Sequence, residues 1–264
     1  MRVTNKSLHE SVVSQLNAVS SAMVAANQVV SSGKKINRLS DDPVGLASVL
    51  NLRSSLANID QLKRNLAMGR SWLEAGESAL TETENILSEA RAFCLQMCSA
   101  NVGSEERSNA VEVVDGYLNL ILALANAEVG GRYIFGGTKT DVAPFLFSGS
   151  AEVMFQGNET PFAIKMGKNM DLAVGRDGEK VFGDCDFDWS DPGAGHDNVF
   201  KTLMDLKNHL LLNDPDAVSE TLSRLDEHLA TIRAAVSDTG AKVLRLETKE
   251  LILEDLRLGY TERK

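Results

Sequence analysis

The chain has 264 residues, enough for one large or two small domains, of which 43% are hydrophobic and 24% charged. Only 5% are aromatic and the formal charge is −10, which favours aliphatic helix packing and argues against nucleic-acid binding, because phosphates need clustered Lys and Arg. No run of about twenty apolar residues predicts a membrane span. The first thirty residues lack the apolar block of a cleavable secretory signal.

The N-terminal segment carries an apolar seam at alternating steps of four and three residues, the spacing of a two-stranded helical packing stripe. Its members are Val12, Leu16, Val19, Met23, Ala26 and Val30. The seam stops before Gly33, a residue suited to the left-handed position that follows a helix. The pattern predicts a helix that packs along another helix.

A longer seam follows, in which an apolar residue recurs every seventh position. It consists of Leu52, Ile59, Leu66, Leu73, Leu80 and Leu87, and the next step reaches Cys94. We predict one helix from Pro43 to near Ala100, roughly 85 Å long at the α-helical rise. Asp42 is its predicted N-cap, with Pro43 at the first helical position and Asp41 near the positive end of the helix dipole.

Two further helical regions are predicted. Ser104 opens a helix, and its short link to the long helix implies an antiparallel hairpin. Helical signal resumes after Asp197, and after Pro215 a third seam runs through Leu222, Leu225, Leu229, Ile232, Val236, Thr239, Val243 and Leu246. Gly240 interrupts that seam at a cost of roughly 1 kcal/mol relative to alanine, so we expect close backbone contact or local flexibility there.

Between residues 130 and 195 glycines become frequent and the apolar period drops toward two, as in short strands. Apolar positions at Phe162, Ile164, Met166, Leu172, Val174 and Val181–Phe182 predict a small antiparallel β module inserted between helices. Gly136 and Gly137 are predicted to form the tight bend where the chain leaves a helix for this module.

The predicted fold is mainly α: an elongated antiparallel helical rod, or coiled-coil-like bundle of long helices, with a small antiparallel β domain at one end. Residues 1–42 form an N-terminal core-pairing segment in this prediction. Residues 43–137 and 196–264 form a discontinuous helical rod domain, and residues 138–195 form the inserted β domain.

Candidate catalytic and ligand-binding residues do not assemble into a recognisable site. His9, His196, His209 and His228 are scattered, and we interpret His209 and His228 as helix-surface residues. We interpret Cys94 and Cys98, four residues apart, as small thiols on the packing face, and assign Cys185 no role.

Two loop motifs resemble ligand-binding loops but lack residues that those loops need. The acidic run from Asp184 resembles the start of a calcium loop, but Trp189 and Gly195 stand where glycine and glutamate are needed. Gly131 and Gly136 have phosphate-loop spacing, but Gly137 replaces the lysine. We therefore predict no catalytic residues, no metal and no cofactor.

Three blocks carry a family resemblance. Ser31–Arg38 with Asp41–Ala47, which contain Asn37, Asp41, Asp42, Pro43 and Gly45, resembles the N-terminal block of the bacterial flagellin family. Ser237–Lys242 resembles the matching C-terminal block. Gly131–Thr140, closing with Pro144–Phe145, is similar to the hook–filament junction branch of that family.

The resemblance implies a structural, non-catalytic role at the joint between flagellar hook and filament, after export through the flagellum's own type III apparatus. It implies contacts with the first hook-associated protein, with flagellin and with other copies of the chain. In family members the terminal segments pair as a coiled coil, and a further C-terminal segment binds an export chaperone. Since this chain ends at Lys264, we expect residues 1 to about 40 to lack their mate and to be poorly ordered or bound to another molecule.

Three alternatives stay open. A filament flagellin would polymerise alone into long filaments. An enzyme or a ligand- or metal-binding module in the β insert would need a deep polar pocket between residues 138 and 195 and a metal signal at Asp184–Asp188. A helical signalling rod, such as a chemoreceptor cytoplasmic domain, is disfavoured by the β insert.

Overall fold

A computed structural model describes residues 5–33, 42–99, 101–147, 153–185 and 197–263. The predicted motif residues Asn37 and Asp41 and most of the acidic run after Cys185 lie outside these ranges. The chain divides into two compact units, residues 60–255 and residues 1–59 with 256–264. Among the described helices, none is both long and apolar enough to cross a membrane.

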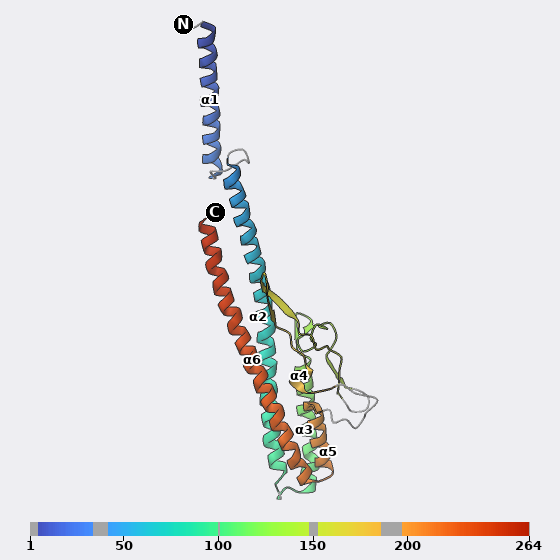
Figure 1. Cartoon of the computed structure of the whole chain (residues 1–264). Helices are drawn as coiled ribbons and strands as arrows, with labels where there is room; N and C mark the ends of the chain where they lie inside the picture. The colour runs from blue at the N-terminus through green and yellow to red at the C-terminus, as the bar shows by residue number, and fades with distance from the viewer. Residues whose placement is uncertain (1–4, 34–41, 100, 148–152, 186–196, 264) are drawn as a thin grey trace. The chain divides into compact units, whose positions relative to one another are not determined.

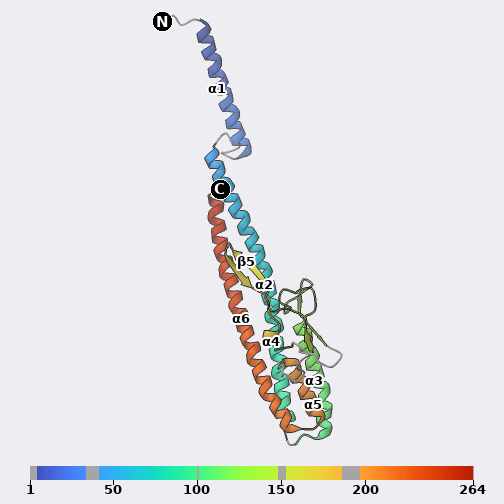
Figure 2. The same cartoon turned by 45° about the vertical axis from the view of Figure 1, so that its right-hand side comes forward.

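The larger unit is built on two long antiparallel helices that lie side by side in both views (Figures 1 and 2). They are α2 (Pro43–Met97) and α6 (Pro215–Glu262). Their buried seams hold Leu66, Leu73, Leu80, Leu87 and Cys94 on α2, and Leu225, Leu229, Ile232, Leu246 and Leu253 on α6. Ion pairs Lys63–Glu254, Glu84–Arg233 and Arg91–Asp226 flank the seams, and their order fixes the antiparallel register. The predicted rod is confirmed for this unit.

Two shorter helices, α3 (Ser104–Ala125) and α5 (Val199–Leu211), pack on each other beside the long pair (Figure 1). Their buried residues include Val114, Leu118 and Ile121 on α3 and Leu203, Leu206 and Leu210 on α5. The helix starts are as predicted: α3 begins at Ser104 and α6 at Pro215. Asp214 caps α6, since its Oδ1 accepts the N–H groups of Asp216 and Ala217 at 3.2 and 3.1 Å.

After α3, the residues that the structure describes form three antiparallel strand pairs, the first of which precedes the predicted insert. They are β1 (Glu128–Val129) with β2 (Arg132–Tyr133), β3 (Phe145–Phe147) with β4 (Val153–Phe155), and β5 (Ala163–Gly167) with β6 (Met170–Ala173). Val181 and Phe182, expected in the β module, instead lie in the helical turn α4 (Glu179–Phe182). Both side chains are buried, at 3% and 0% exposure, whereas neighbouring strand residues would point to opposite faces.

Aromatic packing fixes this strand region to the helices. Phe135, Phe145, Phe182 and Phe200 are fully buried, with ring centroids 5.3–5.9 Å apart in the contacting pairs. Because Phe200 lies in the first turn of α5, the cluster seats the strand region on one end of the α3–α5 pair. The β5–β6 pair lies along the flank of α2, where the Trp72 and Phe162 rings are 5.3 Å apart.

One glycine prediction is corrected and a second is narrowed to one of its alternatives. Helix α3 ends at Ala125, where the Asn126 side chain bonds both the N–H and the C=O of Phe145, so Gly136 and Gly137 form a bend within the strand region and not at the helix exit. Gly137 has a φ of 67°, and a Cβ there would collide with Asn158. At Gly240 a Cβ would meet no described atom within 4 Å, which removes the close backbone contact and leaves local flexibility as the remaining alternative of that prediction.

The smaller unit contains α1 (Asn5–Ser32), the start of α2 and the last residues of α6. Helix α1 ends at Ser32, and Gly33 after it has a φ of 64°, the left-handed conformation predicted for it. Asp42 caps α2, because its Oδ1 accepts the N–H groups of Val44 and Gly45 at 3.1 and 2.8 Å. Pro43 is the first residue of that helix.

Candidate functional site

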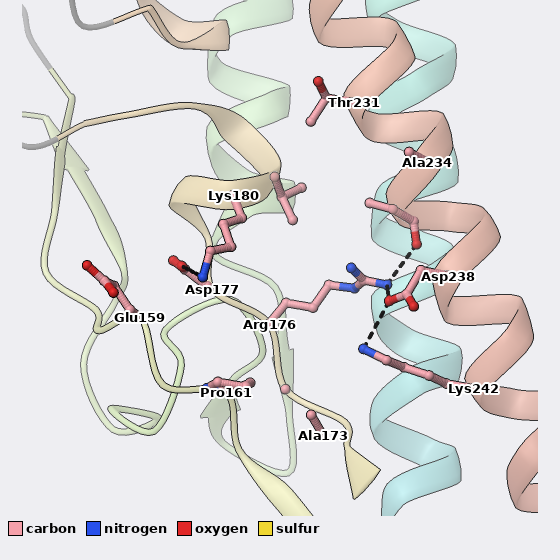
Figure 3. Close-up of a pocket in the computed structure, with 13 residues that line it drawn as sticks. Glu159, Pro161, Ala173, Arg176, Asp177, Lys180, Thr231, Ala234, Asp238 and Lys242 are labelled. Atoms are coloured by element: carbon pink, nitrogen blue, oxygen red, sulfur yellow. Dashed lines mark hydrogen bonds and ion pairs between the residues drawn. The ribbon is translucent and has the colours of Figure 1, made fainter.

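A groove of about 360 Å³ lies between the strand region and α6, within the larger unit (Figure 3). Its apolar lining includes Pro161, Ala173, Val181, Ala234 and Ala235. Its polar lining consists of Glu159, Arg176, Asp177, Lys180, Thr231, Asp238 and Lys242. Charged side chains of both signs therefore meet a floor of small apolar residues.

Arg176 crosses the groove and holds one turn of α6. Its Nη2 donates to the carbonyl of Ala235 at 2.7 Å, to Oδ2 of Asp238 at 2.8 Å and to Oγ1 of Thr239 at 2.6 Å. The side chain is only 13% exposed. Burial lowers the pKa of Arg176, and the Asp238 carboxylate opposes that effect. Since the Arg176 carbonyl also accepts the Gly137 N–H at 3.1 Å, one residue links the glycine bend to α6.

The other groove charges are largely neutralised in place. Lys242 donates to Asp238 at 3.0 Å, and Lys180 pairs with Asp177 at 3.2 Å. Burial by itself raises the pKa of Asp238, but the hydrogen bond and charge of Lys242, with those of Arg176, outweigh burial and lower it. These contacts stabilise the packing of the strand region against α6.

The groove lining offers little for catalysis. It contains no histidine or cysteine, and its one hydroxyl, that of Thr231, donates to the Glu227 carbonyl at 3.1 Å. A nucleophile needs a base within hydrogen-bond reach, and no lining residue supplies that pairing for Thr231. The arrangement is that of a structural clamp.

A second polar cluster contradicts the interpretation of His228 as a surface residue. His228 is 7% exposed, and its Nε2 lies 2.9 Å from Oγ1 of Thr202 and 3.7 Å from Oδ1 of Asp197. Arg224 bonds the same Asp197 oxygen at 2.6 Å. Burial lowers the pKa of His228, with Asp197 opposing and Arg224 adding to the shift. The ring is buried because α5 covers this side of α6, a contact that the sequence pattern of α6 does not reveal.

The cysteines lie apart from any ligand set. Cys94 is fully buried, its Sγ donates to the Val218 carbonyl at 3.2 Å, and burial raises its pKa to about 12, so the thiolate is strongly disfavoured. Cys98 is half-buried and Cys185 buried. Across the described ranges, no three His, Cys, Asp or Glu side chains converge as metal ligands would.

The predicted seam residues fall into three classes of exposure. Buried ones are Ile59, Leu66, Leu73, Leu80, Leu87, Leu225, Leu229 and Ile232. Leu52 and Val236 are half-buried. Val12, Val19 and Met23 of α1 are exposed, at 45%, 67% and 67%.

One buried and one largely buried arginine were not predicted from the sequence. Arg176 is one, and its partner Asp238 lies 62 positions away, although within the block that carries the C-terminal family resemblance. Arg107, 5% exposed, is the other: it donates to the Met97 carbonyl at the end of α2 and to Oδ1 of Asn213, at 3.0 and 2.6 Å. No local signal separates either arginine from a surface cation.

Comparison with known proteins identifies the kind of scaffold to which these features belong. Residues 3–140, just over half of the chain, match the bacterial flagellin N-terminal helical region. This chain belongs to the bacterial flagellin family. The resemblance of its N-terminal motif is thereby confirmed at family level.

Family members of two kinds match the chain differently. Flagellar hook-associated protein 3 of Escherichia coli (strain K12) is 23% identical over 278 residues, covering 99% of this chain and 86% of that protein. Flagellin C of Vibrio anguillarum is 26% identical over 234 residues, covering 85% of this chain but only 59% of the flagellin. Both are structural proteins of the flagellum, and so is this family member.

Solved structures show the same fold. Flagellar hook-associated protein 3 from Legionella pneumophila superimposes with a TM-score of 0.72 at 16% identity, covering 81% of this chain and 97% of that one. FlgL from Bacillus cereus superimposes with a TM-score of 0.67 at 22% identity, covering 81% and 99%. Helical rod and strand region are thus features of this fold.

Proposed function

We propose that this chain joins the flagellar hook to the filament as a hook-associated junction protein and catalyses no reaction. The observation that carries the proposal is the match to hook-associated protein 3 over nearly the whole of this chain and most of the relative. A solved neighbour from Legionella pneumophila, described as the flagellar junction protein FlgL, supports the same role, with a TM-score of 0.69 and 17% identity.

The physical build suits a joint. Antiparallel helices with buried leucine seams resist load along their axes. In the groove between the strand region and α6, most charged side chains are paired with one another and none is positioned as a nucleophile with its base. We propose the first hook-associated protein as the neighbour on the hook side, flagellin as the neighbour on the filament side, and further copies of the chain beside it.

The exposed seam of α1 supports a core-pairing role for residues 1–42, as in the domain division predicted from sequence. Val19, Met23 and Val30 are 67%, 67% and 82% exposed, and an apolar helical stripe of this kind is stabilised by a partner helix. We propose that the rest of the chain divides into a helical rod domain (43–137 and 196–264) and an inserted β domain (138–195).

We place the protein outside the cell, in the flagellum, and propose export through the flagellar type III apparatus with a chaperone that binds a further C-terminal segment. The absence of an apolar block in the first thirty residues is compatible with that route.

Deleting the gene tests the junction role. The mutant is expected to make hooks without attached filaments, to release flagellin into the medium and to lose swimming, with recovery when the gene is returned. Normal filaments firmly joined to hooks would overturn the proposal.

Filament flagellin is the alternative, favoured by the shared family match. It would be supported if the purified chain alone polymerised into long filaments. A ligand- or metal-binding role for the β insert ranks below both, and titration of the purified chain with Ca²⁺ would reveal it as heat release.

A further inference from the structure

Helix α6 carries a second heptad stripe on the side opposite its buried seam. The stripe contains Ser237, Ala241, Leu244, Thr248 and Leu251, all exposed and none charged. Leu244 and Leu251 are 65% and 73% exposed. The solvent side of a helix is ordinarily polar or charged, so an uncharged outer stripe that also steps by four and three is typical of a contact with another helix.

Helix α3 carries a matching stripe on its own outer side. Its members are Asn109, Val113, Gly116, Leu120 and Ala123, again stepping by four and three and uncharged. Val113 and Leu120 are 43% and 54% exposed. A Cβ on Gly116 would meet no described atom within 4 Å, so the stripe alternates large side chains with open positions.

Both stripes lie in the larger unit and both face solvent, so neither is the other's partner within one copy. Their equal stepping fits knobs-into-holes packing, with Leu244 and Leu251 entering the spaces beside Gly116 and Ala123. A second copy of the chain supplies the missing partner for each stripe.

Charge at the edges of the stripes supports a pairing of unlike helices. Glu112 adjoins the α3 stripe and Arg245 adjoins the α6 stripe; both are exposed, and within the described ranges neither has a hydrogen-bond or ion-pair partner. The neighbouring Arg233, by contrast, is already bonded to Glu84 at 2.7 Å. A symmetric α6–α6 contact would leave Arg245 without Glu112 at the edge of the stripe, and a symmetric α3–α3 contact would leave Glu112 without Arg245.

We propose that the α6 stripe of one copy packs on the α3 stripe of a second copy, with Arg245 facing Glu112. Such a contact is heterologous, leaves a free stripe at each end and so propagates into a ring or a helical array. The inference rests on the proposed function for the claim that copies stand side by side.

Cysteine cross-linking of the purified full chain tests the contact. In a Cys98→Ser background, where Cys94 and Cys185 are buried, one sample carries Gly116→Cys and another Thr248→Cys. On oxidation at high concentration, the mixed samples are expected to form dimers severalfold faster than either sample alone. Leu212→Cys, at a residue 75% exposed and off both stripes, is the matched control partner for Gly116→Cys. Equal rates in mixed, single and control samples would overturn the proposal.

Charge reversal sharpens the test. Glu112→Arg in the Gly116→Cys chain, or Arg245→Glu in the Thr248→Cys chain, is expected to slow mixed cross-linking. Both reversals together are expected to restore the rate, provided that circular dichroism shows each variant folded. A doubly reversed pair as slow as the single reversals contradicts the pairing. This assay contains neither hook nor filament, so its result is independent of the gene deletion. Failure of cross-linking overturns the α3–α6 contact alone, and attached filaments after gene deletion overturn the junction role alone.

Discussion

Helices α1 and α2 carry the same apolar periodicity but different surroundings. Leu16 in the seam of α1 is 63% exposed, whereas Leu80 in the seam of α2 is completely buried. Both helices have a well-defined boundary: Gly33 follows the end of α1, and Asp42 with Pro43 marks the start of α2. Their secondary structure therefore does not explain the difference.

The difference is the partner. Along α2 the antiparallel α6 covers the seam, and ion pairs such as Glu84–Arg233 flank it in register. Among the described residues of its unit, α1 has no helix over Val12, Val19 or Met23. A three-and-four repeat thus encodes the need for a partner helix but does not encode which helix supplies it, or whether that helix belongs to the same chain.

The largest expected effect separates the two seams directly. Leu80→Ala should lower the free energy of unfolding by about 3 kcal/mol, because it removes apolar contacts and leaves a cavity in a packed interface. The same change at Leu16 should cost less than about 0.5 kcal/mol, since that side chain is already largely in water. Urea unfolding followed by circular dichroism measures both. Equal losses would show that α1 is packed in the isolated chain.

The next effect compares a buried arginine with an exposed one. Arg176→Met should cost about 2 kcal/mol, because it removes three hydrogen bonds to one turn of α6 from a largely buried cation. Hydrogen exchange should then rise in β5 and β6 before it rises in α2. Arg70→Met, the control, removes a cation 46% exposed and should leave stability nearly unchanged. Unchanged protection of the strands in Arg176→Met would contradict the clamp.

A smaller effect concerns pH. Because burial lowers the pKa of His228, the unfolded chain binds a proton that the folded chain does not in the range between the lowered pKa and the ordinary value. Stability should therefore fall as pH drops through that range and be unaffected by this group above it. His228→Gln keeps a hydrogen-bonding group for Thr202 but cannot titrate, so its unfolding free energy should change less between pH 7.5 and 5.5 than that of the unaltered chain. Identical changes would place the ring in water.

Local signals were sufficient for much of the helical architecture. Gly33, Asp42–Pro43, Ser104 and Asp214–Pro215 mark helix ends because capping and backbone conformation depend on residues a few positions apart. The leucine seams were predictable for the same reason. The predicted long helix ended near Ala100, and α2 ends at Met97.

Features that depend on distant segments were not predictable. Burial of His228 results from Thr202 and the rest of α5, 26 residues away in sequence, and the role of Arg176 from Asp238. The sequence predicts Gly136–Gly137 as the helix exit because no local signal shows that α3 ends at Ala125, where the Asn126 side chain bonds the distant Phe145. Val181 and Phe182 form a helical turn because both must enter the same aromatic core.

The smallest expected effect uses glycine to compare a covered helix face with an open one. Gly240→Ala should stabilise the chain by about 0.5–1 kcal/mol, because alanine favours the helix and its Cβ would meet no described atom within 4 Å. At Gly69 of α2 the new Cβ would press against Ile164 and lie 3.2 Å from Cγ1 of Val174, so overpacking should cancel or reverse the same gain. Thermal unfolding of the two variants measures the contrast. If Gly240→Ala gave no gain, the space beside Gly240 would already be filled in the isolated chain, and the contrast with Gly69 would fail.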